Sequence, residues 1–182
     1  MRIGKENTIA LAIDFQNRLY PKMFESKNNV LLKNVTLLLK GLQALDVPIF
    51  FSQQYTSGLG HTESEIASAV HDFSYFEKMT FSCLDEIQFK EILKKEQPQT
   101  IIVCGIESHI CVQQTVIDLL AAGYRVVVIE DCVSSRKKSD KKTAIRRMEQ
   151  SGAQITSYES ILFELCRYAN IPVFKDISRL IK

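Results

Sequence analysis

The stretch TIIVCGIESHICVQQTVIDLLAAGYRVVVI, residues 100 to 129, decides the fold that the sequence predicts. Two apolar runs, 100–104 and 125–129, have the length and β-branched content of strands that are buried on both faces. Between them, residues 111–123 repeat apolar side chains every three or four positions, and Gly123 stands where a helix C-cap belongs. Strand, helix and strand in this order predict a right-handed crossover between two parallel strands.

The same alternation extends over the rest of the chain. The segment 52–81 fits it less well, and is either a long functional loop or a loop around a short edge strand near 74–77; we favour the strand, because long structureless loops are uncommon. The whole pattern predicts one domain, residues 1–182, built as a three-layer α/β/α sandwich with a central, mostly parallel, Rossmann-like sheet. Further strands are expected at 8–13, 47–51 and 153–158, and further helices at 30–45, 85–96 and 139–152.

Composition and charge exclude several classes of function. A formal net charge of +2 produces no large electrostatic field around the protein. The basic run 136–142 is typical of a solvated face rather than of a nucleic-acid site. The apolar stretch before Asp14 is too short for a signal segment or a membrane span, so we expect a cytoplasmic protein without membrane contact. The five cysteines are odd in number and form no CxxC pair, which favours reduced thiols.

The ligand inventory gives no support for a metal or a cofactor. His61, His71 and His109 are far apart in sequence, and neither HxH nor HExxH spacing occurs. The glycine-rich patterns that cradle phosphates, GxGxxG and GxxxxGK[ST], are also absent from the sequence. We therefore predict a site with no metal and no nucleotide cofactor.

Three chemically active residues fall at the carboxyl ends of predicted strands, where open parallel sheets bind their ligands. Asp14 closes the first strand, Lys78 follows the short edge strand, and Cys111 opens the helix after residues 100–104. A helix start and a nearby ammonium both favour a thiolate, so Lys78 would activate Cys111. Asp14 would move the proton, and the backbone N–H groups of Glu107 and Cys111 would hold an oxyanion.

Each of these residues also has a plainer interpretation. A buried cysteine is usually a small hydrophobic residue, and we expect that role for the four other cysteines, at 83, 104, 132 and 166. From position alone, Cys111 fits a core residue and a nucleophile equally well. Most lysines are solvated, so Lys78 is notable only with a partner, whereas a carboxylate at the end of a buried strand, such as Asp14, must be paired or functional.

At these residues the chain resembles the isochorismatase-like, or cysteine hydrolase, superfamily. The motifs IDFQ, EKMTFS and CGIESHICV are similar to the family's Asp, Lys, Cys triad in its usual order, and QYTSGLGHT, VIEDCVSSR, RRMEQSGA and FKDISRLIK resemble its isochorismatase domain-containing branch. The resemblance implies that Asp14, Lys78 and Cys111 are catalytic, that a cis peptide precedes Glu107, and that the protein is a homo-oligomer. Metal-binding nicotinamidases of this superfamily carry an Asp-x-His motif where this chain has SQQYTSG, so the resemblance does not extend to a zinc site.

The sequence therefore predicts a metal-independent thiol hydrolase that acts on a small amide or related acyl compound through a thioester on Cys111. Two alternatives stay open: a catalytically silent binding or scaffold module of the same fold, and a vinyl ether hydrolase that uses Asp14 as an acid. Cys111 argues against the vinyl ether reaction, which needs no thiol. The residues expected to line the substrate pocket are Phe15, Tyr55, His109 and Ile110.

Overall fold

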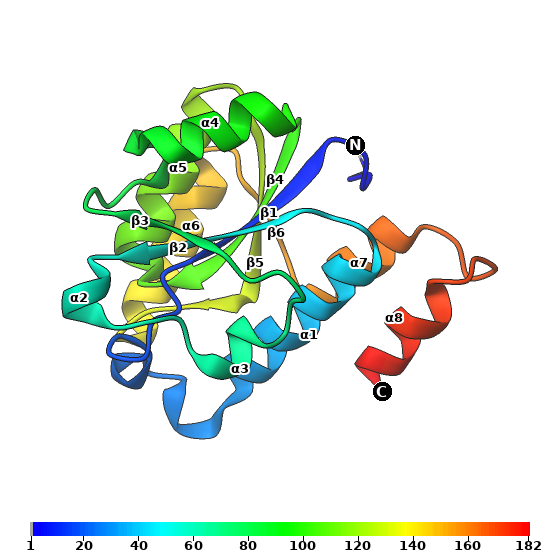
Figure 1. The fold of residues 1–182 in the computed structure, drawn as a ribbon, viewed down its shortest axis with the longest axis horizontal. Coiled ribbons are helices and arrows are strands. Elements are labelled where there is room, and N and C mark those ends of the chain that lie inside the picture. The colour runs from blue at the N-terminus through cyan, green and yellow to red at the C-terminus, as the bar shows by residue number, and fades with distance from the viewer. Residues whose placement is uncertain (1) are drawn as a thin grey trace.

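A computed structural model describes residues 2–182, and a six-stranded sheet forms its centre (Figure 1). The strand order is β3-β2-β1-β4-β5-β6, and every neighbouring pair is parallel. The strands are β1 (Thr8–Ile13), β2 (Ile49–Gln54), β3 (Tyr75–Lys78), β4 (Thr100–Ile106), β5 (Arg125–Ser134) and β6 (Gln154–Thr156). The prediction of a parallel sheet, including its short edge strand, is confirmed.

Helices cover both faces of this sheet, so the predicted three-layer α/β/α arrangement is confirmed (Figure 1). Helices α1, α3, α7 and α8 contribute to the core on one face, and α4, α5 and α6 to the core on the other. None of the helices of residues 2–182 combines the length and the apolar character needed to cross a membrane. The helices are α1 (Val30–Ala44), α2 (Thr56–Leu59), α3 (Ser64–Ala67), α4 (Ile87–Glu96), α5 (Gln113–Ala121), α6 (Lys138–Gln150), α7 (Tyr158–Cys166) and α8 (Phe174–Ile181).

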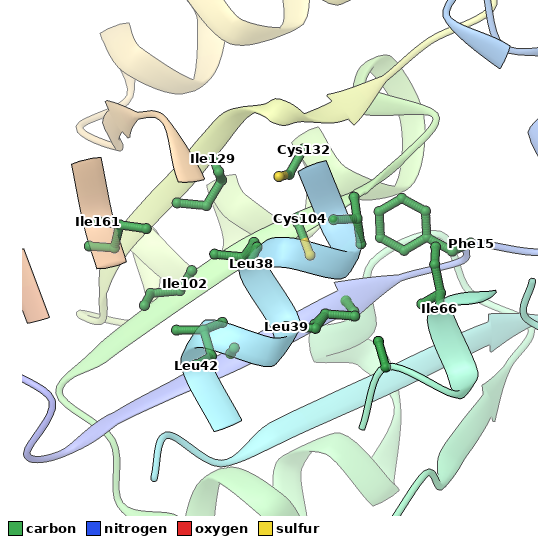
Figure 2. Packing of buried hydrophobic residues seen from close by; sticks show 14 of the residues in the cluster. Phe15, Leu38, Leu39, Leu42, Ile66, Ile102, Cys104, Ile129, Cys132 and Ile161 are labelled. Carbon is green, nitrogen blue, oxygen red and sulfur yellow. The ribbon is translucent and has the colours of Figure 1, made fainter. Parts of the chain in front are cut away.

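The two cores follow from the alternation of side chains along each strand. On β1, Ala10 and Ala12 face α1, while Ile9, Leu11 and Ile13 face the opposite helices. Figure 2 shows the first core, where leucines of α1 lie against the strands and Cys104 lies among apolar side chains. Cys83, Cys104, Cys132 and Cys166 are all buried, as expected for small hydrophobic residues.

Several boundaries differ from the sequence prediction. Strands β4 and β5 continue past their apolar runs, because backbone pairing extends to Ile106 and Ser134 after a register shift near Gly105. The segment 52–81 holds the end of β2, two single-turn helices and β3 instead of one long loop. Helix α8 was not predicted, since its eight residues bury only Ile177 fully and follow no strand.

The order of the strands fixes where the site lies. From β1 the chain builds outward to β2 and β3, and then returns to place β4 on the other side of β1. The strand order therefore reverses between β1 and β4, and their carboxyl ends form the crevice in which open α/β sheets bind ligands. Gly105 allows these ends to approach, since a Cβ at this position would lie 2.7 Å from Ile13 Cβ and 2.8 Å from the Ile13 carbonyl oxygen.

Candidate active site

Asp14 and Lys78 form a buried ion pair at this crevice. Asp14 Oδ2 lies 2.7 Å from Lys78 Nζ, and the two side chains are 1% and 0% exposed. The other carboxylate oxygen, Oδ1, accepts a hydrogen bond of 2.7 Å from Ser52 Oγ. The backbone at Asp14 is left-handed, with φ 55°, which turns the chain sharply as β1 ends and is a conformation that aspartate tolerates better than most residues.

Lys78 reaches Asp14 from the edge strand β3, across the intervening strand β2. Its ammonium also donates to Gln54 Oε1 at 2.6 Å and to the carbonyl oxygens of Thr80 and Phe81, both at 3.3 Å. A lysine that is buried in this way must be compensated by charge and hydrogen bonds. These contacts supply both, so the position of the ammonium is fixed.

The loop after Lys78 is held by one carboxylate. Glu86 Oε1 accepts hydrogen bonds from the backbone N–H groups of Met79 and Thr80, at 3.0 and 3.1 Å, and from the Thr80 hydroxyl at 2.8 Å. The carbonyl groups that face Lys78 therefore belong to a braced loop.

The charge state of Lys78 follows from opposing effects. Burial, the largest single effect, lowers the pKa of Lys78. The negative charge of Asp14, the charges that Cys111 and Cys83 would carry as thiolates, and the hydrogen bond to Asp14 all raise that pKa. The net pKa lies above its ordinary value, so Lys78 is a cation at neutral pH.

Cys111 lies beside this pair, and the structure thus brings the three predicted residues together. It belongs to a π-helical turn, η4 (Ser108–Val112), which connects β4 to α5, and it is 4% exposed. Its thiol lies close enough to Asp14 and Lys78 for both charges to act on it. The Thr115 hydroxyl donates to the Cys111 carbonyl at 2.7 Å and accepts from the Cys83 backbone N–H at 3.0 Å, which ties the turn to its surroundings.

The surroundings of Cys111 oppose the thiolate that a helix start and Lys78 were expected to favour. Burial, followed by the negative charge of Asp14, raises the pKa of the Cys111 thiol well above its ordinary value. The Lys78 ammonium lowers that pKa, but more weakly, because its charge is already paired with Asp14. Cys111 also precedes the first residue of α5, so it is not held at the N-terminus of a regular α-helix.

A second thiol lies behind the first. Cys83, in the turn η3 (Cys83–Asp85), is fully buried, and its backbone N–H is the group that Thr115 Oγ1 accepts from. Burial and then the charge of Asp14 raise the pKa of Cys83 to about 12. The Cys83 thiol is therefore uncharged at neutral pH and contributes only a neutral surface to the site.

Glu107 adopts the left-handed conformation, with φ 59°, directly before the turn that carries Cys111. Its carboxylate is paired with the guanidinium of Arg136, whose side chain is 52% exposed. The cis peptide implied by the family resemblance is not found: no peptide bond of residues 2–182 is cis. The left-handed backbone at Glu107 makes the turn instead.

The four expected pocket-lining residues fall into two groups. Phe15 is 1% exposed and packs in the core near Ile66, so its ring does not face solvent (Figure 2). Tyr55 is 48% exposed, and His109 and Ile110 are half-buried next to Cys111. His109 Nδ1 lies 3.0 Å from Ser135 Oγ.

Sequence reasoning missed Ser52, Gln54 and Glu86, which all contact the triad or its loop. A signal for the first two existed, because IFFSQQ turns from apolar to polar at the carboxyl end of a buried strand, as the strand before Asp14 does. Glu86 had no such signal, since its role depends on how the loop 79–82 folds back. Surface hollows that lie elsewhere in residues 2–182 include one lined by residues 4–6 and 165–168 and one beside α6.

The fold and the site define a parallel α/β protein with an acid, a lysine and a thiol at its topological switch point. The sequence model of the isochorismatase domain matches residues 8–160, and the chain belongs to this family. Isochorismatase domain-containing protein 2A of Mus musculus is 37% identical over 182 residues, which cover 100% of this chain and 85% of that protein. A secreted isochorismatase effector, Isc1, of Phytophthora sojae is 42% identical over 149 residues, 80% of this chain and 71% of the effector.

Solved structures show the same fold. A structure described as the MAR1 ribonuclease of Caenorhabditis elegans superposes with a TM-score of 0.92 at 32% identity, covering 100% of this chain and 92% of that one. The YcaC protein of Pseudomonas aeruginosa superposes with a TM-score of 0.90 at 22% identity, covering 97% of this chain and 89% of that chain. Family and fold together identify the protein as a hydrolase of the isochorismatase family.

Proposed function

We propose that the protein is a metal-independent cysteine hydrolase that cleaves a small amide or related acyl compound through a thioester on Cys111. The observation that carries this proposal is the buried Asp14–Lys78 ion pair, whose two charges both act on the Cys111 thiol. A nucleophile, a proton acceptor and a cation in contact are the parts that acyl transfer by a thiol requires.

In the first half of the proposed reaction, Cys111 Sγ attacks the carbonyl carbon while its proton passes to Asp14. The carbonyl oxygen becomes an oxyanion, which the backbone N–H groups of Glu107 and Cys111 would stabilise. The C–N bond then breaks, and the leaving amine takes the proton from Asp14. The product of this half is an acyl thioester on Cys111 and a neutral amine.

In the second half, a water molecule attacks the thioester and gives one proton to Asp14. The C–S bond breaks, the sulfur takes the proton back, and the acid product leaves. Asp14 thus acts first as a base, then as an acid, and repeats both roles with water. Lys78 does not need to transfer a proton; its charge pairs with the buried Asp14 carboxylate and offsets the negative charge that develops on sulfur.

The raised pKa of Cys111 agrees with this sequence of steps. A thiol that is protonated at rest needs a base in contact with it, and Asp14 is that base. The small exposed fraction of Cys111 favours a small substrate, with Tyr55, His109 and Ile110 as the lining residues that reach the surface. We assign no substrate contact to Phe15, because its ring is in the core.

The donor set at the end of β2 also fits metal-independent chemistry. Gln53 and Gln54 are engaged with Thr62 and Lys78, and no group of three His, Cys, Asp or Glu side chains in residues 2–182 is placed to hold a metal ion. A small-molecule substrate, no nucleic-acid partner, a homo-oligomer and a cytoplasmic location remain predictions. The Phytophthora sojae relative is described as secreted, and an Escherichia coli protein of this fold is described as octameric.

The test is a screen of small amides, ureides and carbamates for ammonia release, with Cys111→Ala as the control. We expect the wild type to release ammonia and to carry the acyl group on Cys111 by mass spectrometry, and Cys111→Ala and Cys111→Ser to be nearly inactive. A single-stranded RNA belongs in the same screen, because structural relatives are described as ribonucleases.

Each other outcome of this screen selects an alternative. Full activity of Cys111→Ala would refute the thioester mechanism. An acyl group on any other cysteine would refute the assignment of the nucleophile. Cleavage of RNA in the absence of amide hydrolysis would replace the substrate class, and no turnover of any compound would favour the binding or scaffold module.

A further inference from the structure

Ser52 is a buried polar residue that the proposed reaction does not use. It lies on β2 with 1% of its surface exposed, opposite Ile13 in the register of β1 and β2. The Asp14 backbone N–H donates to the Ser52 carbonyl at 3.2 Å, and the Ser52 hydroxyl donates to Asp14 Oδ1 at 2.7 Å. An apolar side chain is the usual occupant of such a place, because a buried hydroxyl is costly unless it is hydrogen-bonded.

The direction of the Ser52 hydroxyl is fixed by its neighbours. An ionised carboxylate can only accept hydrogen bonds, so the Ser52 proton must point to Asp14. With Lys78 on Oδ2 and Ser52 on Oδ1, the carboxylate is clamped from both ends.

We propose that Ser52 is a positioning residue, whose hydroxyl holds the Asp14 carboxylate in the orientation that accepts the Cys111 proton. The inference rests on the proposed function, because it assumes that Asp14 is the base. In this role Ser52 acts on Cys111 through Asp14 alone.

The rate of Cys111 alkylation tests this role without a substrate. The titratable groups that interact with Asp14 are Lys78 from β3, Cys111 from η4 and Cys83 from η3, and the two thiols are protonated through the neutral range. In that range, alkylation of Cys111 depends on Asp14 as the proton acceptor, so its rate reports how well the carboxylate is held beside the thiol. Without the Ser52 hydroxyl, Asp14 Oδ1 loses its hydrogen-bond donor, and the rate must fall.

The experiment measures the rate of iodoacetamide labelling of Cys111, by peptide mass spectrometry, at about pH 7 in the full chain. In Ser52→Ala we expect this rate to fall by roughly tenfold, the size set by one hydrogen bond to a charged group. Ser52→Thr and Ser52→Val are a matched pair of nearly equal shape: threonine, which keeps the hydroxyl, should retain the wild-type rate, and valine should lose as much as alanine. Thermal unfolding of each variant checks that it is folded.

Ser82→Ala is the control, since the Ser82 hydroxyl is buried nearby and makes no hydrogen bond. Equal rates in the threonine and valine variants, or an unchanged rate in Ser52→Ala, would overturn the inference. Asp14→Asn separates the inference from the proposed function. If its rate equals that of the wild type, Asp14 is not the base, and the proposed function and the inference fail together; if its rate falls while that of Ser52→Ala is unchanged, only the inference fails.

Discussion

Replacing Lys78 by methionine removes the charge of a buried ion pair while keeping most of the side-chain volume. Lys78 and Asp14 lie 2.7 Å apart with 0% and 1% of their side chains exposed, so solvent cannot screen the carboxylate that is left behind. Breaking a buried pair by removal of one partner typically costs about 3–5 kcal/mol. Gln54 Oε1 also loses its donor at 2.6 Å, and the total is a large part of the roughly 5–15 kcal/mol that stabilises a typical domain.

The free energy of unfolding in urea measures this cost, and the double variant Lys78→Met/Asp14→Asn shows where it comes from. Asparagine can take the left-handed backbone of Asp14 and still accept from Ser52, so it removes the charge and little else. We therefore expect the double variant to be more stable than Lys78→Met by at least about 1 kcal/mol. A loss below about 1 kcal/mol in Lys78→Met, or a double variant less stable than either single one, would refute the electrostatic account of the site.

Three further predictions follow from other parts of the site. Because burial and Asp14 raise the pKa of Cys111, its thiolate forms only at higher pH than that of a free thiol. The alkylation rate should therefore still be rising above pH 9, and Lys78→Met should move that rise to still higher pH. A final plateau of the rate reached by pH 8 would contradict the raised pKa. Gly105→Ala places a methyl 2.8 Å from the Ile13 carbonyl and 3.0 Å from Val112, so it should destabilise the protein by about 1–3 kcal/mol and displace Cys111. We expect a lower melting temperature and slower alkylation of Cys111, and unchanged values of both would show that the strands can separate freely. Any hydrolytic activity should survive EDTA, and loss with recovery on adding zinc would disprove the metal-independent mechanism.

Much of the fold was predictable because the apolar runs are long enough to be strands buried on both faces. The register of β1 against β4, with Ile9 opposite Ile101, places Asp14 next to the start of the Cys111 turn, and this proximity follows from the order of the strands alone. The segment 52–81 was harder. Its short elements are held by side-chain contacts such as Gln53 to Thr62, and periodicity carries no information about such contacts.

The electrostatics of the site was the least predictable part. A helix start and a lysine near Cys111 suggested a thiolate, but the balance depends on depth and on which charge is nearer. The sequence does not show that the charge of Lys78 is already paired with Asp14, or that Cys111 lies in a π-helical turn before α5. Ser52 was missed for the same reason: its importance comes from facing Asp14 from the neighbouring strand, which is a property of the register.

The buried ion pair is better explained by chemistry than by stability. Apolar residues of similar volume often stabilise a protein as well as a buried pair does, so folding alone gives no reason to keep Asp14 and Lys78 at the switch point. In the proposed reaction, the pair holds the Asp14 carboxylate where a thiol can reach it, while the thiol itself stays protonated and 4% exposed. Under this proposal, Cys111 becomes a nucleophile only when an acyl carbon is close enough for sulfur to bond as its proton leaves. Such coupling would protect the resting thiol from unselective electrophiles, and it would make substrate fit, rather than a low thiol pKa, the condition for reaction.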